Sequence, residues 1–185
     1  MEKIMNEFSV ICRILGTLFN RSPEDPITKP LFELISQNQL KLSWPLEQDE
    51  LLTQLAVSSQ DLALVIKDFK QLFLDPTSAI ANGISQYSEI SATAVNEFLV
   101  ANGIPLSAEK ADRFAALLLA ASWLEDNAAQ DPLLTQIQLF DQFILPESES
   151  FFSQVETHAV SDFYLTLVMI THEALVALRE ELADV

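Results

Sequence analysis

Hydrophobic residues recur at intervals of three or four along most of the chain, as they do on one face of an α-helix. The first stripe predicts a helix over about residues 3–19 and consists of Ile4, Phe8, Ile11, Leu15, Leu18 and Phe19. A second stripe, which Ser58 or Ser59 would cap and Pro76 would end, consists of Leu62, Val65, Ile66, Phe69, Leu72 and Phe73. Strand-like alternation is nearly absent. We therefore predict an all-α fold, a bundle of about eight to ten helices.

Caps and prolines mark the other predicted elements. One helix begins near Pro30 with Leu31, Leu34 and Ile35 facing inward, and residues 75–90 form the longest predicted loop. The remaining expected helices are a short one after the Trp44-Pro45 turn with Leu51, Leu52 and Leu55, one capped by Ser91 and closed by Asn102-Gly103, one opened by Ser107, one opened by Asp131-Pro132 and ended by Pro146, a short one marked by Phe151, Phe152 and Val155, and a long one capped by Ser161 that ends near Leu182.

The segment from Asp112 to Asp126 is the most informative part of the chain. Between Phe114 and Leu124 it carries no charge and is apolar on nearly every face, so this helix must be buried on nearly every face. The Asp112-Arg113 pair stands at the entrance of this central element, where a groove would reach it.

Composition limits the possible partners. The 185 residues suit a single domain over residues 1–185, and the net charge is −17. From Phe114 to Val185 the only Lys or Arg is Arg179, which argues against nucleic acid as a ligand. The charge favours a basic peptide or protein as partner, or it serves only to keep the protein in solution. The longest apolar run is too short for a membrane span and the N-terminus is no signal peptide, so we expect a cytoplasmic protein without stable membrane insertion.

The residues that would carry catalysis are largely absent. His172-Glu173 begins like a zinc-protease helix but lacks the second His one turn later, and the sequence has two His and one Cys in all. Cys12 lies near the apolar face of the first helix, where a packed thiol is the simplest interpretation. We therefore expect no metal, no cofactor and no enzymatic activity.

Several of these segments, in the order in which they occur, resemble the TorD/DmsD/NarJ chaperones, which serve the maturation of molybdenum-containing redox enzymes. Within that family the YcdY branch is most similar, on the block from Trp44 to Leu52. The segments that carry the resemblance are Phe8 to Phe19, Asp68-Phe69 through Leu72-Phe73 to Asp75-Pro76, Ser85-Gln86-Tyr87, Asp112-Arg113 with Leu117 to Leu119 and Ala121 to Leu124, and Leu139-Phe140 to Leu145-Pro146.

The resemblance implies a TorD-like fold and a peptide-binding site. Asp112 would receive an arginine of a client's twin-arginine leader, and Ser85 would bind backbone. The apolar part of the leader would lie against Phe69, Leu72, Phe73 and Tyr87. Where the family has His, this chain has Arg113, a permanent cation that would repel a leader arginine unless an acid neutralises it.

Three alternatives to leader binding remain open at this point. The chain would serve as the chaperone of a non-redox metalloenzyme, such as a zinc-dependent phosphoesterase, without leader binding; it would be a generic acidic adaptor; or it would be an enzyme. The resemblance also allows a monomer or a homodimer formed by exchange of helices.

Each candidate site residue also has a plainer explanation that involves no ligand. For Phe69, Leu72 and Phe73 this explanation is ordinary core packing, because their spacing is that of any buried stripe. For Asp112 it is an intramolecular pair or stabilisation of the first helical turn, and for Arg113 it is a solvated charge.

Overall fold

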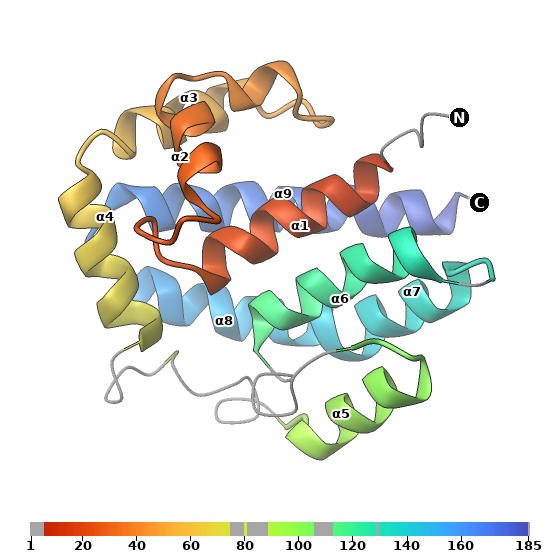
Figure 1. Cartoon of the computed structure of the whole chain (residues 1–185). Helices are drawn as coiled ribbons and strands as arrows, with labels where there is room; N and C mark the ends of the chain where they lie inside the picture. Colours follow the sequence, from red (N-terminus) through yellow and green to blue (C-terminus); the bar gives the residue numbers. More distant parts are fainter. Residues whose placement is uncertain (1–5, 75–79, 81–88, 106–112, 129, 185) are drawn as a thin grey trace.

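The computed structural model describes residues 6–74, 80, 89–105, 113–128 and 130–184, and the regular elements in these ranges are all helical. The all-α prediction is therefore confirmed (Figure 1). The α-helices are α1 Glu7–Asn20, α2 Lys29–Ser36, α3 Asp49–Ser58, α4 Leu62–Phe69, α5 Ala92–Ala101, α6 Phe114–Asn127, α7 Leu133–Leu139, α8 Leu145–His158 and α9 Asp162–Ala183, with π-helical turns at Lys70–Leu74 and Phe140–Ile144 and a 3-10 turn at Leu40–Leu42.

Helices α1 and α6 form an antiparallel pair at the centre of the molecule (Figure 1). Gly16 makes their close approach possible, because a Cβ atom there would lie 2.9 Å from Leu119 Cγ and 3.1 Å from the Ala115 carbonyl oxygen. As its uncharged sequence predicted, α6 buries residues on nearly every face, among them Phe114, Leu117 and Leu118. The long helix α9 packs along α3, α8 and α1.

A polar network fixes the register of this pair at the start of α1. Ser9 Oγ donates to Asp126 at 2.8 Å and lies 2.9 Å from Ser122 Oγ, and Arg13 forms an ion pair with Asp126. Nearby, Glu125 accepts hydrogen bonds from Asn6 at 2.7 Å and from Gln136 at 3.0 Å. These bonds tie the start of α1 to the end of α6 and, through Gln136, to α7.

The observed helix starts confirm some of the predicted caps and correct others. Ser91 Oγ accepts from the Ala94 amide at 3.0 Å, and Gly103 closes α5 with a φ of 69°, both as predicted. The prediction that Ser58 or Ser59 caps α4 was wrong. Asp61 does so by accepting from the Leu64 amide at 3.1 Å, because α3 continues through Ser58 and the next helix begins only after a turn.

The predicted end at Pro146 was also wrong, since α7, the π-helical turn and α8 follow one another without a break. Pro146 lies in the first turn of α8, where its missing N–H is tolerated because the wider turn before it shifts the hydrogen-bond register. As a result the predicted short helix around Phe151 is the 14-residue α8.

Two smaller differences concern α2 and α6. In α2 the inward residues are Phe32 and Ile35, whereas Leu34 is 42% exposed, because the core lies one position round the helix from the expected stripe. In α6 the described helix begins at Phe114, and Ser107 lies outside the described residues. Among the helices of the described ranges, none combines the length and the apolar character that crossing a bilayer requires.

Candidate functional site

Aromatic rings from four segments meet where α1 ends and α6 begins. Phe114 of α6 stacks on Phe151 of α8 with ring centroids 4.4 Å apart, and Phe19 of α1 meets the same ring edge-on at 5.2 Å. Phe73 in the π-helical turn after α4 packs on Phe151 at 6.3 Å and on Phe69 at 5.2 Å. We call these five residues the aromatic cluster. Its offset and edge-on geometries are those that favour aromatic pairs.

A small cavity of about 30 Å³ opens beside the aromatic cluster. Its volume suits one inserted side-chain tip or a water molecule and no larger ligand. The described residues that line it are Phe19, Asn20, Phe69, Phe73, Leu74, Ile80, Arg113, Phe114, Ala115 and Phe151.

Of the predicted site residues, the structure brings Phe69, Phe73 and Arg113 together at this cavity, although about 40 positions separate the first two from the third in the sequence. Leu72 is fully buried and does not line the cavity, so core packing accounts for it. Asp112, Ser85 and Tyr87 lie outside the described residues. Phe69 is also almost fully buried and therefore acts as wall rather than as exposed contact surface.

Sequence reasoning missed three aromatic walls of this cavity, Phe19, Phe114 and Phe151. Each belongs to an apolar stripe that was interpreted only as core. The one available signal was Phe114, which directly follows Arg113 and so had to lie at the same entrance.

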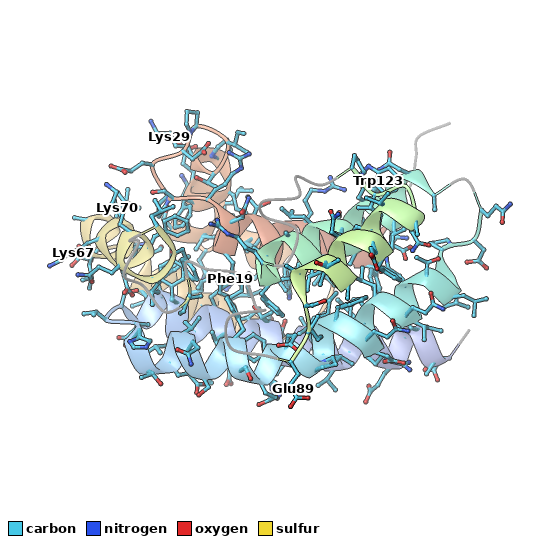
Figure 2. The ribbon with its side chains drawn as sticks, turned by 90° about the horizontal axis from the view of Figure 1, so that it is seen from below. Phe19, Lys29, Lys67, Lys70, Glu89 and Trp123 are labelled. Carbon is cyan, nitrogen blue, oxygen red and sulfur yellow. The ribbon has the colours of Figure 1, made fainter. Side chains whose placement is uncertain are left out.

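Arg113 is the last residue before α6, with extended backbone dihedrals of −75° and 139°. Its carbonyl oxygen accepts the Leu117 amide at 3.1 Å, so the backbone of Arg113 starts the helix, and the residue lines the cavity. Figure 2 shows Lys67 and Lys70 together at the α4 end of the molecule, with Lys29 nearby and Phe19 between that end and α6. Lys70 is paired with Glu24 at 3.0 Å. These lysines thus gather at the α4 end of a protein whose net charge is −17.

Asp68, the acid of the Asp68-Phe69 motif, has a structural task next to the aromatic cluster. It is 1% exposed, and its carboxylate accepts from the Val160 amide at 3.1 Å, the Ser161 amide at 2.8 Å and the Ser161 hydroxyl at 2.6 Å. Ser161 stands at the start of α9 as predicted, but its hydroxyl binds Asp68 instead of capping its own helix. The carboxylate therefore fastens α4 to the turn before α9.

Tyr164 completes the packing behind Phe69 and Phe73, with ring centroids 6.2 Å and 5.6 Å away. Burial, with a smaller contribution from the charge of Asp68, raises the pKa of Tyr164 well above its usual value. Its hydroxyl has no hydrogen-bond partner among the described residues. Tyr164 therefore supports Phe69 and Phe73 from behind and does not itself line the cavity.

The described residues contain no group of three or more His, Cys, Asp or Glu side chains placed to hold a metal ion. His172 is half-exposed on α9 with Nε2 3.4 Å from Glu149, and Cys12 is fully buried. Burial, helped by the charges of Glu125 and Glu181, raises the pKa of the Cys12 thiol far above its usual value. The prediction of a packed thiol is therefore confirmed.

Sequence comparison shows which known proteins this chain is similar to. Chaperone protein YcdY of Escherichia coli (strain K12) is 42% identical over 181 residues, which cover 97% of this chain and 98% of that protein. The chain belongs to the TorD/DmsD family of chaperones. An uncharacterized Haemophilus influenzae protein is 38% identical over 99% of this chain and 98% of its own length. The Tat proofreading chaperone DmsD of Salmonella typhi is 28% identical over 88% of this chain and 84% of its own length. No family model matches the chain.

The TorD/DmsD relationship agrees with the all-α fold of the described residues. The cavity beside the aromatic cluster is bounded mostly by apolar residues, with Arg113 as its charged member among the described residues.

Proposed function

We propose that this protein is a maturation chaperone that holds part of an immature client metalloenzyme at the aromatic cluster. The observation that carries this proposal is the convergence of Phe69, Phe73 and Arg113 from distant parts of the chain around one cavity. An apolar side chain of the client would enter the cavity, and polar groups of the client backbone would meet the guanidinium.

The client segment of first choice is a twin-arginine leader of a molybdoenzyme, held until its cofactor is inserted. Such a leader combines an apolar run with arginines. The cavity walls suit the apolar run, and Asp112 would accept a leader arginine.

The apolar half of the proposal is tested with a matched pair of variants. Phe73 and Phe143 are buried alike, at 7% and 6% exposure, but only Phe73 lines the cavity. With a fluorescent leader peptide, Phe73→Ala should weaken binding about tenfold or more, as expected for loss of a buried ring contact. Phe143→Ala should leave the affinity nearly unchanged. Equal losses in both variants would show that general destabilisation, and not the cavity, governs binding.

The electrostatic half is tested with Asp112→Ala and a salt titration. If Asp112 receives an arginine, both the variant and higher salt should weaken leader binding. An affinity that neither change alters would refute the role of Asp112.

A non-redox metalloenzyme, such as a zinc-dependent phosphoesterase, is the second candidate client, in which case no leader is bound. Two observations favour it. The chain is more similar to YcdY than to the DmsD protein whose name refers to Tat proofreading, and the cation Arg113 lines the cavity that a leader arginine would have to approach. Affinity purification from the native cell distinguishes the two clients. Recovery of a molybdoenzyme would support leader binding, whereas recovery of a hydrolase that has no twin-arginine leader would support the second candidate.

A further inference from the structure

A second surface, which shares no lining residue with the cavity at the aromatic cluster, lies along the outward side of α9. Leu165, Met169 and Val176 follow one another there at positions that leave them partly or largely exposed, with Met169 at 51%. The stripe from Leu165 to Val176 spans roughly 16 Å, about three helical turns. We call these three residues the α9 ridge.

Two hollows flank the α9 ridge and share Met169 as a common wall. The larger, about 450 Å³, lies between α9 and α3, where Val57 is 69% exposed. The smaller, about 240 Å³, lies between α9 and α8 and has Phe152 in its lining. A ridge with a hollow on each side offers an apolar surface to the side chains of another helix.

The described side chains that line the two hollows carry three carboxylates and one imidazole. Glu149 and Glu156 line the α8 hollow together with His172, whose Nε2 lies 3.4 Å from Glu149, and Asp162 lines the α3 hollow. In α3, α8 and α9 together the only Lys or Arg is Arg179, which binds Asp141 at 2.7 Å and is therefore directed to α7 and its π-helical turn. The cations Lys29, Lys67 and Lys70 gather instead at the α4 end (Figure 2).

We propose that the α9 ridge is a docking surface for a basic amphipathic helix of a partner protein. Leucine-like residues of that helix would fill the two hollows on either side of Met169. Its Lys or Arg residues would lie opposite Glu149, Glu156 and Asp162. The proposal goes beyond the cavity at the aromatic cluster, because it gives the chaperone a second binding surface. This acidic surface would select a positively charged partner.

A second copy of this chain is a poor occupant of the same surface. Two α9 ridges facing each other would bring like-charged rims together, which costs free energy at an interface. A basic helix meets both requirements, apolar contact and charge neutralisation.

Binding of a designed probe tests this proposal. The probe is a labelled 16-residue helical peptide of Leu, Ala and Lys with its leucines on one face, and the control peptide has the same composition in scrambled order. Met169→Lys should weaken probe binding about tenfold or more. Leu134→Lys is the matched control: it changes the net charge equally at a 75% exposed residue of α7, and it should alter the affinity less than about twofold.

Each further outcome decides the question. Equal binding of the scrambled peptide, or equal losses in both variants, would reduce the surface to nonspecific acidity and overturn the proposal. Loss of probe binding in Phe73→Ala would place the peptide at the aromatic cluster and would also overturn it. If sedimentation shows that Met169→Lys turns a dimer of the free protein into a monomer, the occupant is a second copy and the proposal is wrong.

Discussion

The two ends of the α1–α6 pair are built in opposite ways. At one end Ser9, Arg13, Ser122 and Asp126 satisfy one another through hydrogen bonds and an ion pair. At the other end the contact consists of aromatic rings and leaves a small cavity beside Arg113. Directional polar bonds define one arrangement of the helices, whereas ring packing tolerates small shifts. In the function proposed above, the polar end would keep the frame fixed while the aromatic end accepts a client side chain.

The largest expected effect in the fold concerns Asp68, which supports the aromatic end from α4. Asp68→Ala would leave the Val160 and Ser161 amides and the Ser161 hydroxyl without their acceptor, at a cost of roughly 3 kcal/mol in the free energy of unfolding. Urea denaturation measures this loss. Asp162→Ala, at an exposed position in the first turn of α9, is the control and should cost far less.

Gly16 lies between the two ends, so a larger residue there should disturb both. Gly16→Val would force its side chain against Leu119 and the Ala115 carbonyl and destabilise the fold by about 1–3 kcal/mol. Thermal unfolding gives the magnitude. A variant as stable as the parent would show that α1 and α6 can separate at little cost, which contradicts a rigid frame.

The polar end is tested by Ser9→Ala. This variant removes the hydroxyl that links Ser122, Asp126 and Arg13, and we expect a loss of about 1 kcal/mol. Ser36→Ala, which removes an exposed hydroxyl bonded only within its own helix, should be nearly neutral. If Ser9→Ala lowers the free energy of leader binding by more than it lowers the free energy of unfolding, the polar and aromatic ends are not independent.

The smallest effect concerns the pH dependence contributed by Glu181. Partial burial, followed by the charges of Glu125 and Glu7, raises the pKa of Glu181 above its usual value. The folded state therefore holds this proton to higher pH than the unfolded state, and the contribution of Glu181 to stability falls as pH rises through that window. Glu181→Gln should flatten the decline of Tm with pH above about 4.5. An unchanged pH profile would contradict this.

The helical periodicity of the sequence determined the fold class, most helix positions and the buried character of α6. These features depend on neighbours a few residues apart, so the order of apolar and polar residues suffices to predict them. Pro146 misled that reasoning, because a π-helical turn earlier in the chain decides whether a proline ends a helix. The cap of α4 was missed for a related reason. Asp and Ser can both cap a helix, and the position at which α3 ends determines that Asp61, and not Ser59, caps α4.

For the candidate site, the sequence by itself named Arg113, Phe69 and Phe73, and only the tertiary structure brought them to one cavity and added Phe19, Phe114 and Phe151. It also decided that Leu72 is core and that Asp68 binds the turn before α9. Which apolar residues wall a cavity depends on contacts between helices that lie far apart in the chain. Periodicity indicates which side of each helix is buried, and packing decides what that side meets.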